Sequence, residues 1–126
     1  MVEPGAVARG AAVAVAVCLP LALLGRALQD GDGSPLSALL FLGVLAGLAA
    51  GGAVAARAAA DVPFTNGGLA ALLAYVAIQG TALVVSAFTD GDTASVPSLV
   101  FNALLAYGCG VAGSAIVGRR ARRAST

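Results

Sequence analysis

The sequence predicts an all-α polytopic membrane protein with four transmembrane helices in a single domain, residues 1–126. Hydrophobic residues make up 60% of the 126 residues and charged residues only 10%, whereas soluble domains carry about 25% charged residues. The mean hydropathy is +0.96. Four apolar segments each approach or exceed the roughly 18–20 residues that span a hydrocarbon core as a helix. Helices are required because lipid offers no hydrogen-bond partner to an unpaired backbone.

The four apolar segments are separated by short polar connections. They run from about Ala11 to Leu28, Leu36 to Ala56, Gly67 to Phe88, and Ser98 to Val117. Pro20 lies inside the first segment, where a proline is expected to kink a helix. Arg9 before an apolar stretch is also how a signal peptide begins. We expect the segment to be retained, because its removal would leave the chain ends on opposite sides of the membrane.

The arginines predict the orientation. Six of the seven basic residues precede the first segment, separate the second from the third, or follow the fourth: Arg9, Arg57, Arg119, Arg120, Arg122 and Arg123. Cytoplasmic loops carry an excess of arginine and lysine, so both termini are predicted to be cytoplasmic in a multi-pass protein of the cell membrane. The other two connections carry Asp30, Asp32, Asp90 and Asp92 and are predicted to lie outside.

The sequence also indicates an internal repeat. Asp-Gly-Asp occurs at residues 30–32 and again at 90–92, an offset of 60 residues. After these turns the offset becomes 62, with Pro35 matching Pro97 and Arg57 matching Arg119. The pattern predicts a parallel duplication of a helical hairpin, with halves at about 6–60 and 66–122. Such repeats are related by an axis along the membrane normal.

The acidic turns have two interpretations. The stretch "DGDGS" resembles the opening of a calcium loop, but such a loop needs a glutamate at its twelfth position, which here is Phe41. Turn formation, which Asp-Gly favours, is therefore the preferred interpretation, and no metal is predicted. Ser34 before Pro35 is expected to cap the second helix, and Ser95 to cap the fourth in the same way.

Small residues recur every four positions on two helices. The second carries Gly43, Gly47 and Gly51, and the fourth carries Ala106, Gly110, Ser114 and Gly118. Small residues let membrane helices approach closely. If the halves are duplicates, the two rows are equivalent and would meet near the pseudo-axis. Packing within any bundle, or against a neighbouring copy, is the alternative.

Polar residues form one stripe on the third segment. Tyr75, Gln79 and Ser86 share a helix face. An unpaired amide near mid-span is costly, so Gln79 is expected to bond to Tyr107 or Cys109. Asn102, on the fourth segment, is expected to bond close to the loop. These side chains act either as interhelical hydrogen-bonding groups or as the lining of a substrate pathway.

The four segments lack recognisable catalytic or ion-coupling chemistry. None carries an acidic, basic or histidine side chain at mid-span, where coupled transporters place one. The small multidrug-resistance exporters also have four spans but depend on a glutamate in the first helix, which is absent here. No phosphate loop or nucleic-acid signature occurs, and Cys18 and Cys109 read as apolar fillers. We therefore expect no enzymatic activity, no cofactor and no nucleic-acid partner.

Two stretches carry a family resemblance. "GGAVAARAA" (Gly51 to Ala59), followed by "NGGLAALLAYV" (Asn66 to Val76), is similar to the YrzE-like family of small, uncharacterised four-span bacterial membrane proteins. The resemblance covers about a quarter of the chain. It implies the same four-span architecture and no established activity.

Two functions are consistent with these features. The first is a non-enzymatic structural or accessory subunit that packs against itself or against a larger membrane complex. The alternative is a small oligomeric transporter or channel with a pathway near Gln79. The basic tail, residues 119–126, contains Arg119, Arg120, Arg122 and Arg123. It is expected either to rest on anionic lipid of the bilayer or to dock an acidic cytoplasmic partner.

The predicted orientation can be tested with single cysteines. A cysteine at Gly33 or Thr93 should react with a membrane-impermeant thiol reagent added to intact cells, because both positions are predicted to face outward. A cysteine at Ser125 should stay unlabelled. Labelling of Ser125 from outside would reverse the orientation.

Overall fold

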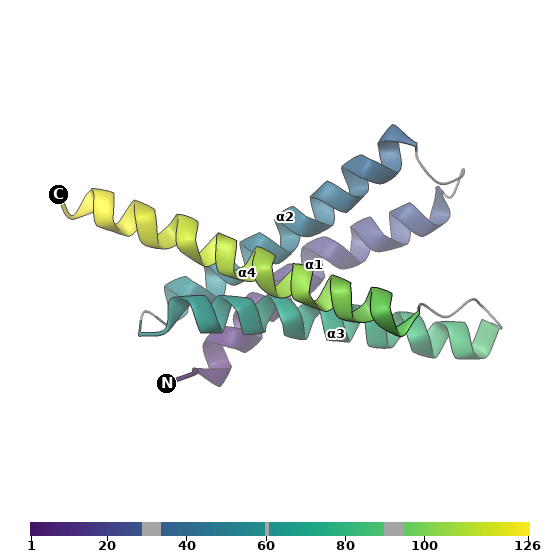
Figure 1. Cartoon of the computed structure of the whole chain (residues 1–126), viewed down its shortest axis with the longest axis horizontal. Coiled ribbons are helices and arrows are strands. Elements are labelled where there is room, and N and C mark those ends of the chain that lie inside the picture. Colours follow the sequence, from purple (N-terminus) through teal and green to yellow (C-terminus); the bar gives the residue numbers. More distant parts are fainter. Residues whose placement is uncertain (29–33, 60, 90–94) are drawn as a thin grey trace.

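The chain folds into four antiparallel helices. The computed structural model describes residues 1–28, 34–59, 61–89 and 95–126. The helices are α1 (Pro4–Ala27), α2 (Pro35–Ala58), α3 (Pro63–Thr89) and α4 (Val96–Ala124), and these residues contain no strand (Figure 1). All four are long and apolar enough to cross a membrane. The predicted all-α, four-helix fold is confirmed. Both Asp-Gly-Asp turns lie outside the described residues, and so do Gly33 and Thr93.

Proline begins each helix or follows its first residue. A proline at the first helical position loses no hydrogen bond and has a helical φ. In α2 the Ser34 hydroxyl accepts a hydrogen bond from the backbone N–H of Ser37 at 3.2 Å, which confirms the predicted cap. Ser95 stands at the same position before α4, but its side chain makes no capping bond. Here Pro97 is the second helical residue, and it offers no N–H to a capping oxygen.

The helices extend beyond the predicted apolar segments, most of all at the start of α1 and at the end of α4. α1 begins at Pro4 and includes Arg9, and it remains one helix through Pro20. α4 continues through the basic tail to Ala124. Arginines in the last turn of a helix interact favourably with its negative end. The tail is helical from Arg119 to Ala124.

The helices pack as two hairpins that are close at one end and diverge at the other. α1 contacts α2 and α3, α4 contacts α2 and α3, and α2 also contacts α3, whereas α1 and α4 do not touch in the described parts of the chain. Both termini lie at the close end, which we term the terminal half (Figure 1). In the other half, α1 ends and α2 begins, and α3 ends and α4 begins; we term it the connection half. Here the α1–α2 hairpin diverges from the α3–α4 hairpin (Figure 1).

Glycines bring the four backbones together in the terminal half. A Cβ at Gly10 of α1 would lie 2.5 Å from the Gly51 carbonyl oxygen of α2. On α2, a Cβ at Gly52 would collide with the Gly110 backbone of α4. A Cβ at Gly110 would in turn collide with the Gly67 carbonyl of α3. We refer to these five residues as the glycine layer. It allows the helices to touch along their backbones, where any larger side chain would separate them.

The small-residue row of α2 faces α1. A Cβ at Gly43 would lie 3.0 Å from the Leu21 side chain, and one at Gly47 would lie 2.8 Å from Cys18 Sγ. α2 does meet α4, but on a different face, where Ala49 lies against Gly113 and Gly52 against Gly110. The row of α4 is divided: Gly110 is in the glycine layer, whereas a Cβ at Gly118 would have no atom within 4 Å.

Leucine substitutions should separate the glycines at helix contacts from those that face outward. Gly51→Leu and Gly52→Leu should each destabilise the fold, because the new side chain has no space between the backbones. Overpacking of this kind typically costs about 1–3 kcal/mol. The measurement is the thermal unfolding temperature in mild detergent.

Gly108→Leu is the matched control, because a Cβ at Gly108 would meet nothing within 4 Å. It should leave the unfolding temperature unchanged. Equal effects of all three substitutions would contradict the described packing.

Candidate functional site

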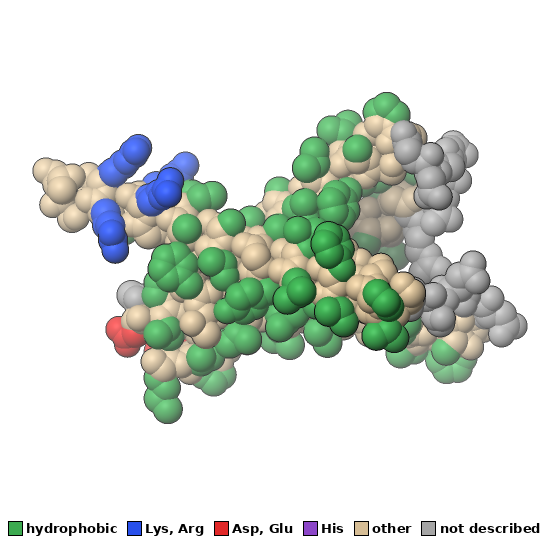
Figure 2. Space-filling model, viewed as in Figure 1, with side chains coloured by type: hydrophobic (Ala, Val, Ile, Leu, Met, Phe, Trp, Pro, Cys, Tyr) green, Lys and Arg blue, Asp and Glu red, His purple; other side chains and the backbone are tan. Residues whose placement is uncertain are grey.

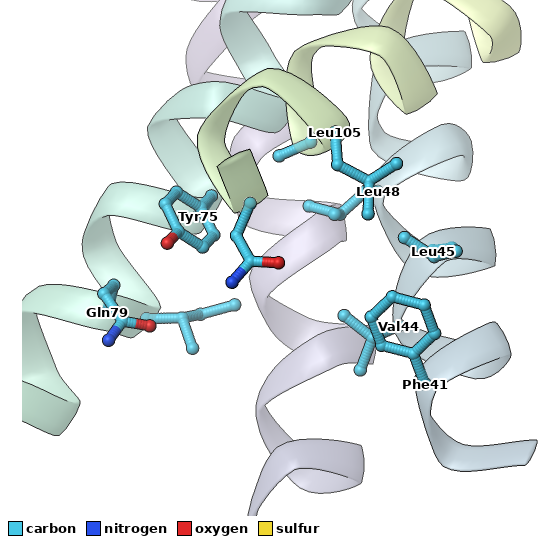
Figure 3. Close-up of a pocket in the computed structure, with 10 residues that line it drawn as sticks. Phe41, Val44, Leu45, Leu48, Tyr75, Gln79 and Leu105 are labelled. Carbon is cyan, nitrogen blue, oxygen red and sulfur yellow. The ribbon is translucent and has the colours of Figure 1, made fainter. Parts of the chain in front are cut away.

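A cleft lies between the diverging hairpins. Its volume is about 230 Å³, and it is lined by residues of α2, α3 and α4. The α2 wall is apolar and consists of Phe41, Val44, Leu45 and Leu48. Tyr75 and Gln79 of α3 lie across the gap from it (Figure 3). The remaining lining residues are Ile78, Asn102, Leu105 and Ala106.

The cleft is closed toward the terminal half. Leu48 and Ala106 are buried, with 4% and 1% of their surfaces exposed. One helical turn further along α2 and α4 come Gly52 and Gly110, which touch through their backbones. The glycine layer therefore blocks the continuation of the cleft through the bundle.

Three polar side chains line the cleft, and only some of their hydrogen-bonding groups are used. The Tyr75 hydroxyl donates to the Leu99 carbonyl oxygen of α4 at 3.1 Å. Asn102 Nδ2 donates to Ser98 Oγ, one turn earlier in the same helix, at 3.4 Å. Gln79 is half-buried, and within the described ranges its amide makes no hydrogen bond.

The prediction that Gln79 bonds to Tyr107 or Cys109 is wrong. The Tyr107 ring lies beside Gly68, where an added Cβ would be 2.5 Å from the ring. Gly68 and Gln79 are 11 residues apart on α3, about three helical turns, so Tyr107 is far from the amide. No hydrogen bond joins Gln79 to Cys109 either within the described residues. Asn102 bonds within the first turns of α4, near the position that we expected.

The residues of the polar stripe on α3 do not all line the cleft. Tyr75 and Gln79 line the cleft, whereas Ser86 is buried and is not among the lining residues. The cleft therefore brings together three of the four polar residues selected from the sequence. It adds Phe41 and Leu105, for which hydrophobicity alone gave no signal, since the spans are apolar throughout.

Asn66 is a buried polar residue that sequence reasoning overlooked. Its side chain is fully buried, and its Oδ1 accepts a hydrogen bond from the backbone N–H of Glu3 at 3.2 Å. This bond attaches the start of α1 to the first turns of α3. An asparagine before two glycines at a helix start was the available signal. Its Nδ2 has no partner among the described atoms.

Ser114 forms a hydrogen bond within the glycine layer. Its buried hydroxyl lies 2.9 Å from the Gly110 carbonyl oxygen in its own helix and 3.3 Å from that of Gly52 in α2. Both carbonyls are possible acceptors for the single hydroxyl proton. The contact joins α4 to α2 where their backbones meet.

The four tail arginines are exposed on the projecting end of α4 (Figure 2). Arg119, Arg120 and Arg123 line a hollow of about 240 Å³ together with Ile116. Positive charge beside an apolar side chain suits the boundary between acyl chains and headgroups.

The described residues contain no group of three or more histidine, cysteine or acidic side chains that could hold a metal ion. The aspartates of the two acidic turns are outside this set. Cys18 is buried, and its thiol donates to the Val44 carbonyl oxygen at 3.3 Å. Cys109 is half-buried. The Cys18 thiol thus lies between α1 and α2.

Fold and site define a class: a small four-helix integral membrane protein with a half-closed cleft between two hairpins. Comparison with protein-family models, with curated proteins and with solved structures gave no match. The similarity of residues 51–59 and 66–76 to the YrzE-like family stays a prediction.

The two tyrosines provide a test of the cleft geometry. Tyr75→Phe should lower stability by about 0.6 kcal/mol, the average for interhelical hydrogen bonds in membrane proteins, because the bond to Leu99 is lost. Tyr107→Phe should have no effect, since the described contacts of Tyr107 are made by its ring. Thermal unfolding in detergent measures both. A larger loss for Tyr107→Phe would contradict the arrangement.

Proposed function

We propose that this small integral membrane protein is a non-enzymatic accessory subunit that packs against itself or against a larger membrane complex. The glycine layer carries the proposal. It closes the bundle by backbone contact, which favours a packing unit over a conduit. The apolar spans, with no ionisable group near their centres, support the same function because ion coupling requires such groups.

The surface of the spans provides room for a partner. Large apolar side chains project outward from three helices, with exposed fractions of 65% for Leu39, 58% for Val84 and 68% for Leu104. Such side chains suit lipid and the helices of a neighbouring subunit equally well. The basic end of α4 projects beyond them (Figure 2) and adds a charged surface for an acidic partner or for anionic lipid.

The alternative is a small oligomeric transporter or channel, and the cleft favours it. Gln79 and Asn102 would supply polar groups along a pathway. The pathway would require either a second copy or separation of the helices at the glycine layer. We propose further that both termini are cytoplasmic, which places the cleft toward the outer surface.

The composition of the extracted complex distinguishes the two functions. After extraction in mild detergent, an accessory subunit should run at a mass well above the 12.1 kDa of the chain and should contain a larger membrane protein. A homogeneous dimer or small ring of this chain alone would keep the transporter or channel open.

The tail can be tested in the same preparation. Replacing Arg119, Arg120, Arg122 and Arg123 with glutamine should preserve the topology, because Arg9 and Arg57 remain. If the tail contacts only lipid, the co-purifying proteins should also be unchanged. Loss of one specific protein with the topology intact would show instead that the tail docks that partner. A control that replaces Ser125 and Thr126 should change neither result.

A further inference from the structure

The cleft contains hydrogen-bonding groups that its own walls leave unused. The Gln79 amide has no partner within the described residues, and Asn102 uses one amide hydrogen in a long 3.4 Å contact. A polar amide that lies in hydrocarbon without a hydrogen bond is unfavourable. An occupant that supplies a hydroxyl or carbonyl group would remove this cost.

The remaining lining restricts the occupant. None of the ten lining residues is charged, and seven of them are aliphatic or phenylalanine. An ionised ligand would have no counter-charge in the cleft, so an uncharged ligand is favoured. The apolar wall of α2 faces the polar groups of α3 (Figure 3), which suits a molecule with one polar end and a hydrocarbon body.

The size restricts it further. An apolar cavity of about 150 Å³ holds benzene, and drug-sized ligands occupy roughly 300–1,000 Å³. The cleft, at about 230 Å³, fits a polar head and the first part of one hydrocarbon chain. Because the hairpins diverge at this level, the rest of the chain can extend between them into the bilayer.

A second copy of the chain would fit the cleft poorly. The outer surface of the spans presents side chains such as Leu39, Val84 and Leu104. These side chains would fill the space but would leave the Gln79 amide unpaired.

We propose that the cleft binds an uncharged single-chain amphiphile, in which a hydroxyl or carbonyl head bonds to Gln79 and Asn102 and the chain lies against Val44 and Leu45. This proposal is independent of the accessory role, since a subunit or a transporter could bind such a molecule.

Photo-crosslinking of the whole protein in phosphatidylcholine vesicles tests it. The probe is hexadecanol with a diazirine in its chain, and hexadecane with the same diazirine is the control probe. A neutral hydrogen bond contributes about 0.5–1.5 kcal/mol, so the alcohol should label cleft residues about two- to tenfold more than the alkane. Mass spectrometry locates the labelled residues.

Three variants and one control identify the groups responsible. Gln79→Leu should reduce the ratio of alcohol to alkane labelling to about one, and Asn102→Leu should lower it. Thr81→Val is the control, because Thr81 is exposed and its hydroxyl bonds to Ala77 of its own helix; it should leave the ratio unchanged. Leu45→Phe should reduce cleft labelling by both probes, because the larger ring occupies the space of the chain.

Three results would overturn the proposal: equal labelling of the wild-type cleft by both probes, an unchanged ratio in folded Gln79→Leu protein, or labelling by both probes confined to residues outside the cleft. Should Gln79→Leu fail to fold, judged by its melting curve, Asn102→Leu decides the outcome in the same way. The mass of the extracted complex tests the accessory role separately.

Discussion

The structure depends on contact between backbones at the glycine layer. In lipid, helices gain little from hiding apolar surface, so association relies on close packing and interhelical hydrogen bonds. Gly10 meets Gly51, Gly52 meets Gly110, and Gly110 meets Gly67, so the chain of contacts passes through all four helices. The Ser114 hydroxyl adds a polar contact within this layer.

The cleft is a consequence of the same constraint. Side-chain size sets the distance between two packed helices. In the terminal half the facing residues are glycines, and the helices touch. In the connection half Phe41, Leu45, Tyr75 and Leu105 occupy the facing positions, and the hairpins diverge (Figure 1). A tight layer at one level and bulky residues at the next therefore produce a cleft with a closed floor.

The ends of the helices are stabilised by different interactions. Proline and Ser34 define the start of α2, and the Asn66 side chain attaches the start of α1 to α3. At the other end of the chain, α4 extends beyond the bundle with four arginines in its final turns. Charge there serves both the helix terminus and an anionic surface. Of these features, the Asn66 bond and the four arginines lie at the terminal end.

The sequence by itself determined the number and type of elements. Four long apolar segments can only be helices in a membrane. Ser34 followed by Pro35 predicted where one of these helices begins. It also selected Tyr75, Gln79 and Asn102, because polar side chains are rare in such segments. Only the tertiary structure decided the partners. Gly51 faces α1 while its neighbour Gly52 faces α4, a choice that a row of small residues does not encode. Burial of Asn66, and the absence of a partner for Gln79 within the described residues, likewise depend on which helices become neighbours. Apolar helices present similar surfaces on every side, so hydrophobicity does not show which face meets which neighbour. The arrangement is decided only when all four helices pack together.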